Sequence, residues 1–274
     1  MSAAPRFDAH LHLQDSRLQP HLDAIVVELR RLGITRWGVN GTGESDWPEV
    51  ARLAERYPEV LPCYGLHPWF VTDRSDHWEE TLAEFLSNLD ARAIAVGEIG
   101  LDKWIRHHDI DDQEHVFRRQ LRLAQDAGLP AVIHCLKAWG RLRDVLQSDW
   151  NSENEAFLLH SFGGPAEMIP DFAELGGYFS FSGYFLHERK ANVLDSFRRI
   201  PRDRILIETD APDMALPESR EIHPLTAIDG ERLNHPANLI AVYQGLAEVL
   251  EISVETLAAE VAANFERFYH PPPL

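Results

Sequence analysis

Short apolar runs alternate with longer amphipathic segments along almost the whole chain of 274 residues. Each of these runs is nearly continuous in apolarity, which is typical of strands that are covered on both faces of a parallel sheet. Eight runs are present: Arg6–Leu13, Arg36–Gly41, Val60–His67, Ala93–Gly100, Pro130–Leu136, Ala156–Phe162, Tyr178–Gly183 and Arg204–Asp210. Eight strands alternating with helices predict an α/β fold, a single (β/α)8 TIM barrel, rather than an open doubly wound sheet.

The segments between the runs have the periodicity of amphipathic helices. Gly33, Gly128 and Gly176 stand where three of these helices should end. No linker or change in composition marks a boundary, so residues 1–274 are expected to form one domain. The expected helices include Leu22–Gly33, Trp47–Tyr57, Trp78–Leu89, Gln113–Gly128 and Pro165–Gly177, followed by two around Pro236–Leu250 and Val254–Tyr269. The stretch Pro212–Asn234, which precedes the last two helices, is expected to be irregular.

Composition limits the classes of protein to which the chain can belong. The hydrophobic fraction of 45% and the charged fraction of 26% are ordinary for a soluble globular protein. No apolar stretch is long enough to span a membrane and the first residues do not form a signal peptide, so we expect a cytoplasmic protein without a membrane partner. Cys63 and Cys135 fall in apolar runs and are expected to be buried thiols in a reducing compartment.

Charge argues against one kind of partner. The chain has 26 basic and 44 acidic residues, a net charge of −18, which disfavours a protein that grips long duplex DNA through its phosphates. Divalent cations bound at a site can still supply a local positive field for a phosphate substrate. The sequence leaves the oligomeric state open.

Polar residues inside the apolar runs gather toward the C-terminal ends of those runs. A barrel brings these ends together at one mouth, where the active sites of barrel enzymes lie. His10 and His12 also share one face of the first run, because alternate residues of a strand point the same way. The residues concerned are His10, His12, His67, Glu98, His134, His160 and Asp210.

Six of these residues are predicted metal ligands: His10, His12, Glu98, His134, His160 and Asp210. Their mixture of imidazole and carboxylate suits two divalent ions, with zinc, manganese and magnesium as the candidates. Glu98, on the fourth run, is the expected bridge between the ions. Two ions about 3.5 to 4 Å apart activate a water and stabilise charge on a phosphoryl or carbonyl oxygen, which indicates a hydrolase.

Two carboxylates are also predicted to take part in catalysis. Glu98 would hold both ions, and Asp210 would ligate one ion and accept the proton of the attacking water. Glu208, two residues before Asp210, is expected to support a ligand. Each residue alone has a plainer explanation, because a lone His134 or His160 is more often a hydrogen-bonded core residue and Asp210 could cap a turn. Burying all six without an ion or a dense hydrogen-bond network would be costly.

The motifs "DAHLHL", "GLHP", "GEIGLD", "VIHC", "HSFGG", "ETDAP", "NHPANL" and "AANFERF" follow one another along nearly the whole chain. In these motifs the sequence resembles the TatD family of metal-dependent deoxyribonucleases, within the amidohydrolase-like barrel superfamily. The resemblance implies a barrel, phosphodiester hydrolysis and a binuclear metal site on the six residues named above.

The chain departs from the pattern of this family at positions expected to touch the substrate. Lys103 replaces the usual tyrosine after the "GEIGLD" aspartate, and the fifth run continues as Leu136 and Lys137 in place of the usual arginine. The later motif reads Leu233–Pro236 where the family has Arg-Asn-Glu-Pro. The predicted substrate-binding residues are His67, Trp69, Asp102, Lys103 and Lys137, with Asp102 able to orient a ligand or a loop.

Aromatic and basic residues also follow several runs: Trp69, Phe70, Trp104, Trp139 and Tyr184, with Lys103, Arg106, Lys137, Arg141, Arg189 and Lys190. Aromatic rings beside cations stack unpaired bases and guide a nucleic-acid strand. The alternative is that these residues begin helices and pack against neighbouring loops. The remaining histidines, including His21, His107, His108, His115 and His187, are expected to be solvated.

Three functions compete. The leading one is hydrolysis of phosphodiester bonds in DNA, in single strands or frayed ends. The second is hydrolysis of a small amide, ester or lactone, where a carboxylated lysine often bridges the metals; Glu98 and His134 make this alternative weaker. The third is a barrel without catalytic activity that binds a partner.

Overall fold

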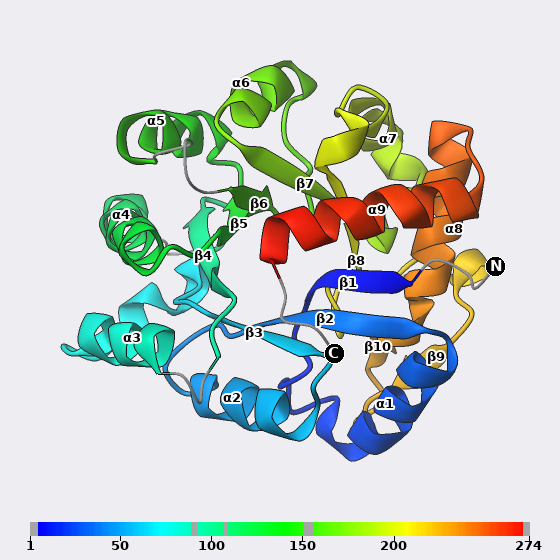
Figure 1. Cartoon of the computed structure of the whole chain (residues 1–274), viewed down its shortest axis with the longest axis horizontal. Helices are drawn as coiled ribbons and strands as arrows, with labels where there is room; N and C mark the ends of the chain where they lie inside the picture. Colours follow the sequence, from blue (N-terminus) through cyan, green and yellow to red (C-terminus); the bar gives the residue numbers. More distant parts are fainter. Residues whose placement is uncertain (1–4, 89–91, 107–108, 151–155, 271–274) are drawn as a thin grey trace.

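The computed structural model describes residues 5–88, 92–106, 109–150 and 156–270. Eight parallel strands follow one another around a barrel in sequence order (Figure 1), which confirms the predicted (β/α)8 architecture. The strands are β1 Arg6–Leu11, β2 Ile34–Asn40, β3 Val60–Tyr64, β4 Ala95–Asp102, β5 Ala131–Leu136, β6 Phe157–Leu159, β7 Gly177–Ser182 and β8 Ile205–Glu208.

The barrel closes just beyond the ends of β1 and β8. The amide of Asp210 donates to the carbonyl of His10 over 2.9 Å, and the amide of His12 donates to the carbonyl of Ala211 over 2.8 Å. These bonds join the first and last strands at the C-terminal mouth. They therefore place Asp210 directly beside His10 of β1 and His12, which lies just past the end of that strand.

Helices surround the barrel on its outside (Figure 1). Their apolar faces are buried against the strands, and their ends carry ordinary capping groups. Asp109, for example, accepts hydrogen bonds from the amides of Asp111 and Asp112 at the start of α4, and Gly128 ends that helix with a φ of +65°. The helices are α1 Leu22–Arg31, α2 Trp47–Arg56, α3 Trp78–Ser87, α4 Ile110–Ala127, α5 Trp139–Asp149, α6 Ile169–Glu174, α7 Ala191–Phe197, α8 Leu239–Leu250 and α9 Val254–Tyr269.

The last helix covers one end of the barrel (Figure 1). Phe265, Phe268 and Tyr269 of α9 pack against residues from the first halves of the strands, and the Tyr269 hydroxyl donates to the carbonyl of Ala9 over 2.6 Å. These aromatic rings fill the N-terminal end of the barrel. Solvent therefore reaches the polar residues at the C-terminal ends of the strands through the C-terminal mouth.

Several boundaries differ from those expected from the sequence. Strand β6 ends at Leu159, so His160 lies just past it, and α6 begins only at Ile169, with Pro170 in its first turn. The stretch expected to be irregular contains an antiparallel hairpin of β9 Pro224–Thr226 and β10 Arg232–Asn234. In the described part of the chain, no helix is both long and apolar enough to cross a membrane.

Candidate metal centre

Glu98 of β4 lies at the centre of the polar cluster and directs each carboxylate oxygen to a different group of histidines. Its Oε2 atom is 3.2 Å from Nε2 of His10 and 3.3 Å from Nε2 of His12. Its Oε1 atom is 2.9 Å from Nδ1 of His134 and 2.7 Å from Nε2 of His160. The carboxylate therefore separates two groups of nitrogen donors, as a bridging ligand does.

Asp210 belongs to the first group of donors. Its Oδ1 atom lies 3.6 Å from Nε2 of His10 and 3.5 Å from Nε2 of His12. The residue has a φ of +55°, a left-handed conformation uncommon for a side chain other than glycine. The turn after β8 that contains it directs its carboxylate into the cluster, and strain of this kind gathers at functional sites.

The chemistry of the donors fits divalent cations. Nε2 of His10 and Nε2 of His12 face each other over 3.3 Å, and Nδ1 of His134 faces Nε2 of His160 over 3.2 Å. Protons on both of two facing imidazole nitrogens repel each other, whereas a shared cation satisfies the lone pairs of both nitrogens. Within the described part of the chain, three sets of donor atoms are close enough together to hold an ion: His10, His160 and Asp210; His10, His12 and Glu98; and His67, Glu98 and His134.

Groups behind the ligands hold the rings in place. Nε2 of His134 lies 3.0 Å from Oδ2 of Asp102, and Nδ1 of His12 lies 2.9 Å from the carbonyl of Asn40. Glu208, expected to support a ligand, has Oε1 3.7 Å from Nδ1 of His160 and also accepts from the amide and hydroxyl of Ser161. Contacts of this kind fix the tautomer and orientation of metal-binding histidines.

Burial and pairing shift the pKa values inside the cluster. Burial raises the pKa of Glu98, but the surrounding histidines outweigh it and hold that pKa well below its usual range. Burial likewise lowers the pKa of His12, yet hydrogen bonds to Asp210 and Glu98 raise it well above the usual value. The pKa of Asp102 falls to about 2, because hydrogen bonds from His134 and Trp69 outweigh its burial. Without an ion, the carboxylates Glu98 and Asp210 thus favour the protonated form of His12.

The structure places the other predicted site residues at different depths. His67, expected at the mouth, is buried, with Nε2 3.2 Å from Oε1 of Glu98. Trp69 is half exposed, and its indole N–H donates to Oδ2 of Asp102 over 2.6 Å. Lys103 and Lys137 are exposed next to the ends of β4 and β5. His67 therefore joins the ligand cluster, whereas the two lysines lie at its rim.

Two of the aromatic and basic residues predicted to contact nucleic acid instead make contacts within the protein. Trp139 begins α5 and packs its ring against Phe162 and Phe172, and Arg141 pairs with Asp111 and Glu114. For these two residues the packing alternative is the correct one. His107 and His108 lie outside the described residues.

Two residues near the cluster were missed from the sequence. Asp8 is fully buried on β1, where its carboxylate accepts from the amide and the hydroxyl of Thr209, next to Asp210; burial raises its pKa to about 8. Asn40 ends β2 and meets His12 through its carbonyl. Asn40 follows the pattern of polar residues at the ends of apolar runs, and Asp8 shares a strand face with His10, so both signals were present.

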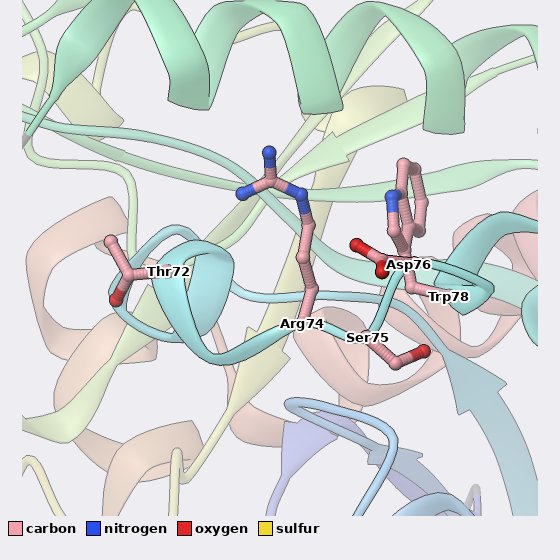
Figure 2. Close-up of a pocket in the computed structure, with 5 residues that line it drawn as sticks. All are labelled: Thr72, Arg74, Ser75, Asp76 and Trp78. Atoms are coloured by element: carbon pink, nitrogen blue, oxygen red, sulfur yellow. The ribbon is translucent and has the colours of Figure 1, made fainter.

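A separate polar hollow of about 400 Å³ lies on the surface between β3 and α3 (Figure 2). Thr72, Arg74, Ser75, Asp76 and Trp78 line it. Figure 2 shows the Arg74 side chain extended toward the green helix α4, where it pairs with Asp112 at 2.8 Å. None of the six predicted ligands lines this hollow, so it is distinct from the metal cluster.

A parallel barrel with a buried cluster of histidines and carboxylates at its C-terminal mouth defines the class of metal-dependent barrel hydrolases. Comparison with known protein families identifies the family within this class. Residues 7–270 match the model of the TatD related DNase family, and the chain belongs to this family.

The similarity to individual relatives extends over nearly the whole length of both chains. The chain is 30% identical to the 3'-5' ssDNA/RNA exonuclease TatD of Citrobacter rodentium, over 96% of this chain and 97% of the relative. It is 29% identical to the uncharacterized metal-dependent hydrolase YabD of Bacillus subtilis, over 96% and 98% of the two chains. The crystal structure of the TatD homologue YjjV of Escherichia coli superposes with a TM-score of 0.88 at 25% identity, over 97% and 98% of the chains.

Proposed function

We propose that this protein is a nuclease that uses two divalent ions to hydrolyse phosphodiester bonds at the ends of single-stranded nucleic acid. One observation carries the proposal: the two oxygens of Glu98 face separate groups of imidazole nitrogens at 2.7 to 3.3 Å. His10, His12 and Asp210 would hold one ion, His134 and His160 the other, and Glu98 both. Zinc, manganese and magnesium are the candidate ions.

Asp210 is the proposed proton acceptor for the attacking water. Divalent ions bound here would supply Lewis acidity toward a phosphoryl oxygen and lower the pKa of a water. The side chain of Asp210 is 12% exposed, compared with 3% for Glu98, so Asp210 is the carboxylate that solvent from the mouth reaches more easily. Burial raises the pKa of Asp210, but hydrogen bonding to His12 and the charges of nearby histidines lower it overall, so the carboxylate is ionised and able to take a proton.

The remaining polar residues position the reacting groups. Asp102 fixes the ring of His134, so that Nδ1 of His134 points at Glu98. His67 contributes a further nitrogen on the Oε1 side of Glu98, where it would bind the ion on that side or a substrate oxygen. The pKa of His67 is lowered to about 4, mainly by burial, which leaves its ring neutral and suited to either role.

Nucleic acid is the proposed substrate because the relatives in this family include proteins named as exonucleases for single-stranded DNA and RNA. The alternative of a small amide, ester or lactone lacks the bridging lysine often found with that chemistry. The only lysines of the chain are Lys103, Lys137 and Lys190, and none belongs to a strand. We propose the cytoplasm as the compartment, because Cys63 and Cys135 are buried as free thiols.

An assay on short oligonucleotides tests the proposal. Purified protein is supplied with manganese, magnesium or zinc, its metal content is measured, and cleavage of single-stranded DNA and RNA is followed. We expect cleavage that requires the ion and that is lost in Asp210→Asn. Exposed Asp126→Asn on α4 serves as the matched control and should cleave like the native protein. A protein that holds two ions and cleaves neither strand would refute the nuclease function.

A further inference from the structure

The few lysines of the chain share one location in the fold. The three lysines are Lys103, Lys137 and Lys190, and all other basic side chains are arginines. Lys103 follows β4, Lys137 follows β5, and Lys190 lies in the short helix Glu188–Lys190 after β7. All three therefore lie on loops at the C-terminal mouth, and we call them the lysine arc.

The lysine arc carries charge that the protein itself does not neutralise. Among the described residues, none of the three lysines forms an ion pair with a carboxylate. Several arginines on the outer helices are paired instead, as Arg30 is with Glu59 at 2.6 Å and Arg119 is with Glu79 at 2.5 Å. In a chain with a net charge of −18, unpaired cations gathered at one place indicate a site for an anionic ligand.

Exposed aromatic rings accompany the lysine arc. Trp104 is 60% exposed and Trp69 is 42% exposed, and both follow strands at the mouth. The backbone of Lys103 donates to the carbonyl of Leu136 over 2.9 Å, which fixes Lys103 and Lys137 on neighbouring strand ends. After β7, the ammonium group of Lys190 lies 5.0 Å from the centre of the Tyr184 ring.

One buried carboxylate ties these rings to the metal cluster. Oδ2 of Asp102 accepts from the indole N–H of Trp69 over 2.6 Å and lies 3.0 Å from Nε2 of His134. Oδ1 of Asp102 accepts from the amide of Trp104 over 2.5 Å. Both tryptophan segments are thus held at a fixed place relative to a predicted metal ligand.

The opposite side of the mouth has the reverse charge. Arg17, after β1, pairs with Asp15 and Asp213, each at 2.8 Å, and with Glu231 at 3.4 Å. Three carboxylates around one arginine leave this side acidic, and it would repel a phosphate chain. An anionic strand is therefore directed over β4, β5 and β7.

We infer that Trp69 and Trp104 form a stacking subsite for an unpaired nucleobase, and that the lysine arc binds the phosphates of the same strand as it leaves the metal cluster. This inference rests on the proposed function and narrows the substrate to a single-stranded chain of several nucleotides. The rings supply stacking that tolerates any base, and the lysines supply contacts to successive phosphates. A small ester would use neither.

Binding to an oligonucleotide with phosphorothioate linkages at both ends tests the subsite in the metal-loaded protein. Fluorescence anisotropy gives the affinity over a range of salt concentrations. Each phosphate contact contributes about 0.7 to the slope of log affinity against log salt for a single strand. We expect the double variant Lys103→Gln with Lys137→Gln to lower this slope by about 1.4. Arg52→Gln on α2, a paired arginine far from the mouth, is the matched control.

A second arm isolates the stacking. Trp104→Ala should weaken binding roughly tenfold for a strand that carries bases and leave binding unchanged for an abasic strand with the same number of phosphates. Unchanged slopes in the lysine variant, or an equal loss by Trp104→Ala on both strands, would overturn the subsite. Cleavage by the native protein is a separate measurement. Cleavage with unchanged slopes refutes the subsite alone, whereas altered slopes without cleavage refute the nuclease function and support the subsite.

Discussion

At the scale of single residues, the metal centre depends on the two oxygens of Glu98. Each oxygen faces a different group of histidine nitrogens, so a change to this one carboxylate affects both proposed ions. We expect Glu98→Gln to lower the metal content below two ions per chain and to reduce hydrolysis by more than about a hundredfold, since changes to residues behind the ligands already cost 10–100-fold. Elemental analysis and the cleavage assay measure these effects. Glu80→Gln on the exposed face of α3 is the control, and full metal content in Glu98→Gln would contradict the bridging role.

Asp102 shows how a residue without direct access to the ions affects them. Its carboxylate faces His134 and receives the indole N–H of Trp69. An asparagine keeps the size but removes the charge that supports the His134 ring. We therefore expect Asp102→Asn to weaken metal binding by about 10–100-fold while the fold is retained. Metal titration gives the affinity, and a circular dichroism spectrum like that of the native protein shows that the fold is intact. An unchanged affinity would show that Asp102 only shapes the loop.

At the scale of elements, helix ends make small and separable contributions to stability. The side chain of Asp109 accepts from the amides of Asp111 and Asp112 at the start of α4, on the outside of the barrel. Asp109→Ala should lower the free energy of unfolding by about 1 kcal/mol without affecting cleavage. Urea denaturation measures the change. Asp126→Ala, near the other end of α4, lacks a capping role and should alter stability by less than about 0.5 kcal/mol.

The sequence predicted the strands and helices better than it predicted how deeply individual side chains of the loops are buried. Buried strands require continuous apolar runs, and polar residues at the ends of these runs had to meet at one mouth, so the ligand cluster could be predicted from position alone. The burial of His67 could not be predicted in this way, because it depends on how the loop after β3 turns toward Glu98. The packing of Trp139 depends in the same way on Phe162, a residue distant in sequence. Contacts between loops are set by packing, which strand periodicity does not encode.

At the scale of the whole molecule, the net charge of the chain is negative, whereas positively charged lysines lie around the mouth of the barrel. The chain is strongly acidic, yet its unpaired lysines lie around the site, and the buried cluster holds both imidazoles and carboxylates. Without an ion, the negative charge of the carboxylates favours the protonated form of some of these histidines. Burial lowers the pKa of His160, but Glu98 and Glu208 raise it well above the usual value. The pKa of His134 is raised in the same way by Asp102 and Glu98 against the effect of burial.

Metal binding is therefore expected to release protons. A histidine with a raised pKa keeps its proton to a higher pH than an ordinary imidazole, and it must lose that proton before its nitrogen can bind an ion. Affinity should fall as the pH falls, about tenfold per pH unit for each proton released. Below the usual histidine pKa the metal-free protein keeps the stabilisation from its imidazolium and carboxylate pairs, and it loses that stabilisation as the pH rises through the raised values of His12, His134 and His160. The ion thus replaces the proton as the counter-charge of Glu98 and Asp210.

Calorimetric titration of metal into metal-free protein, in two buffers with different heats of ionisation, measures the protons released. Equal heats in both buffers would show that the histidines are neutral before the ions bind.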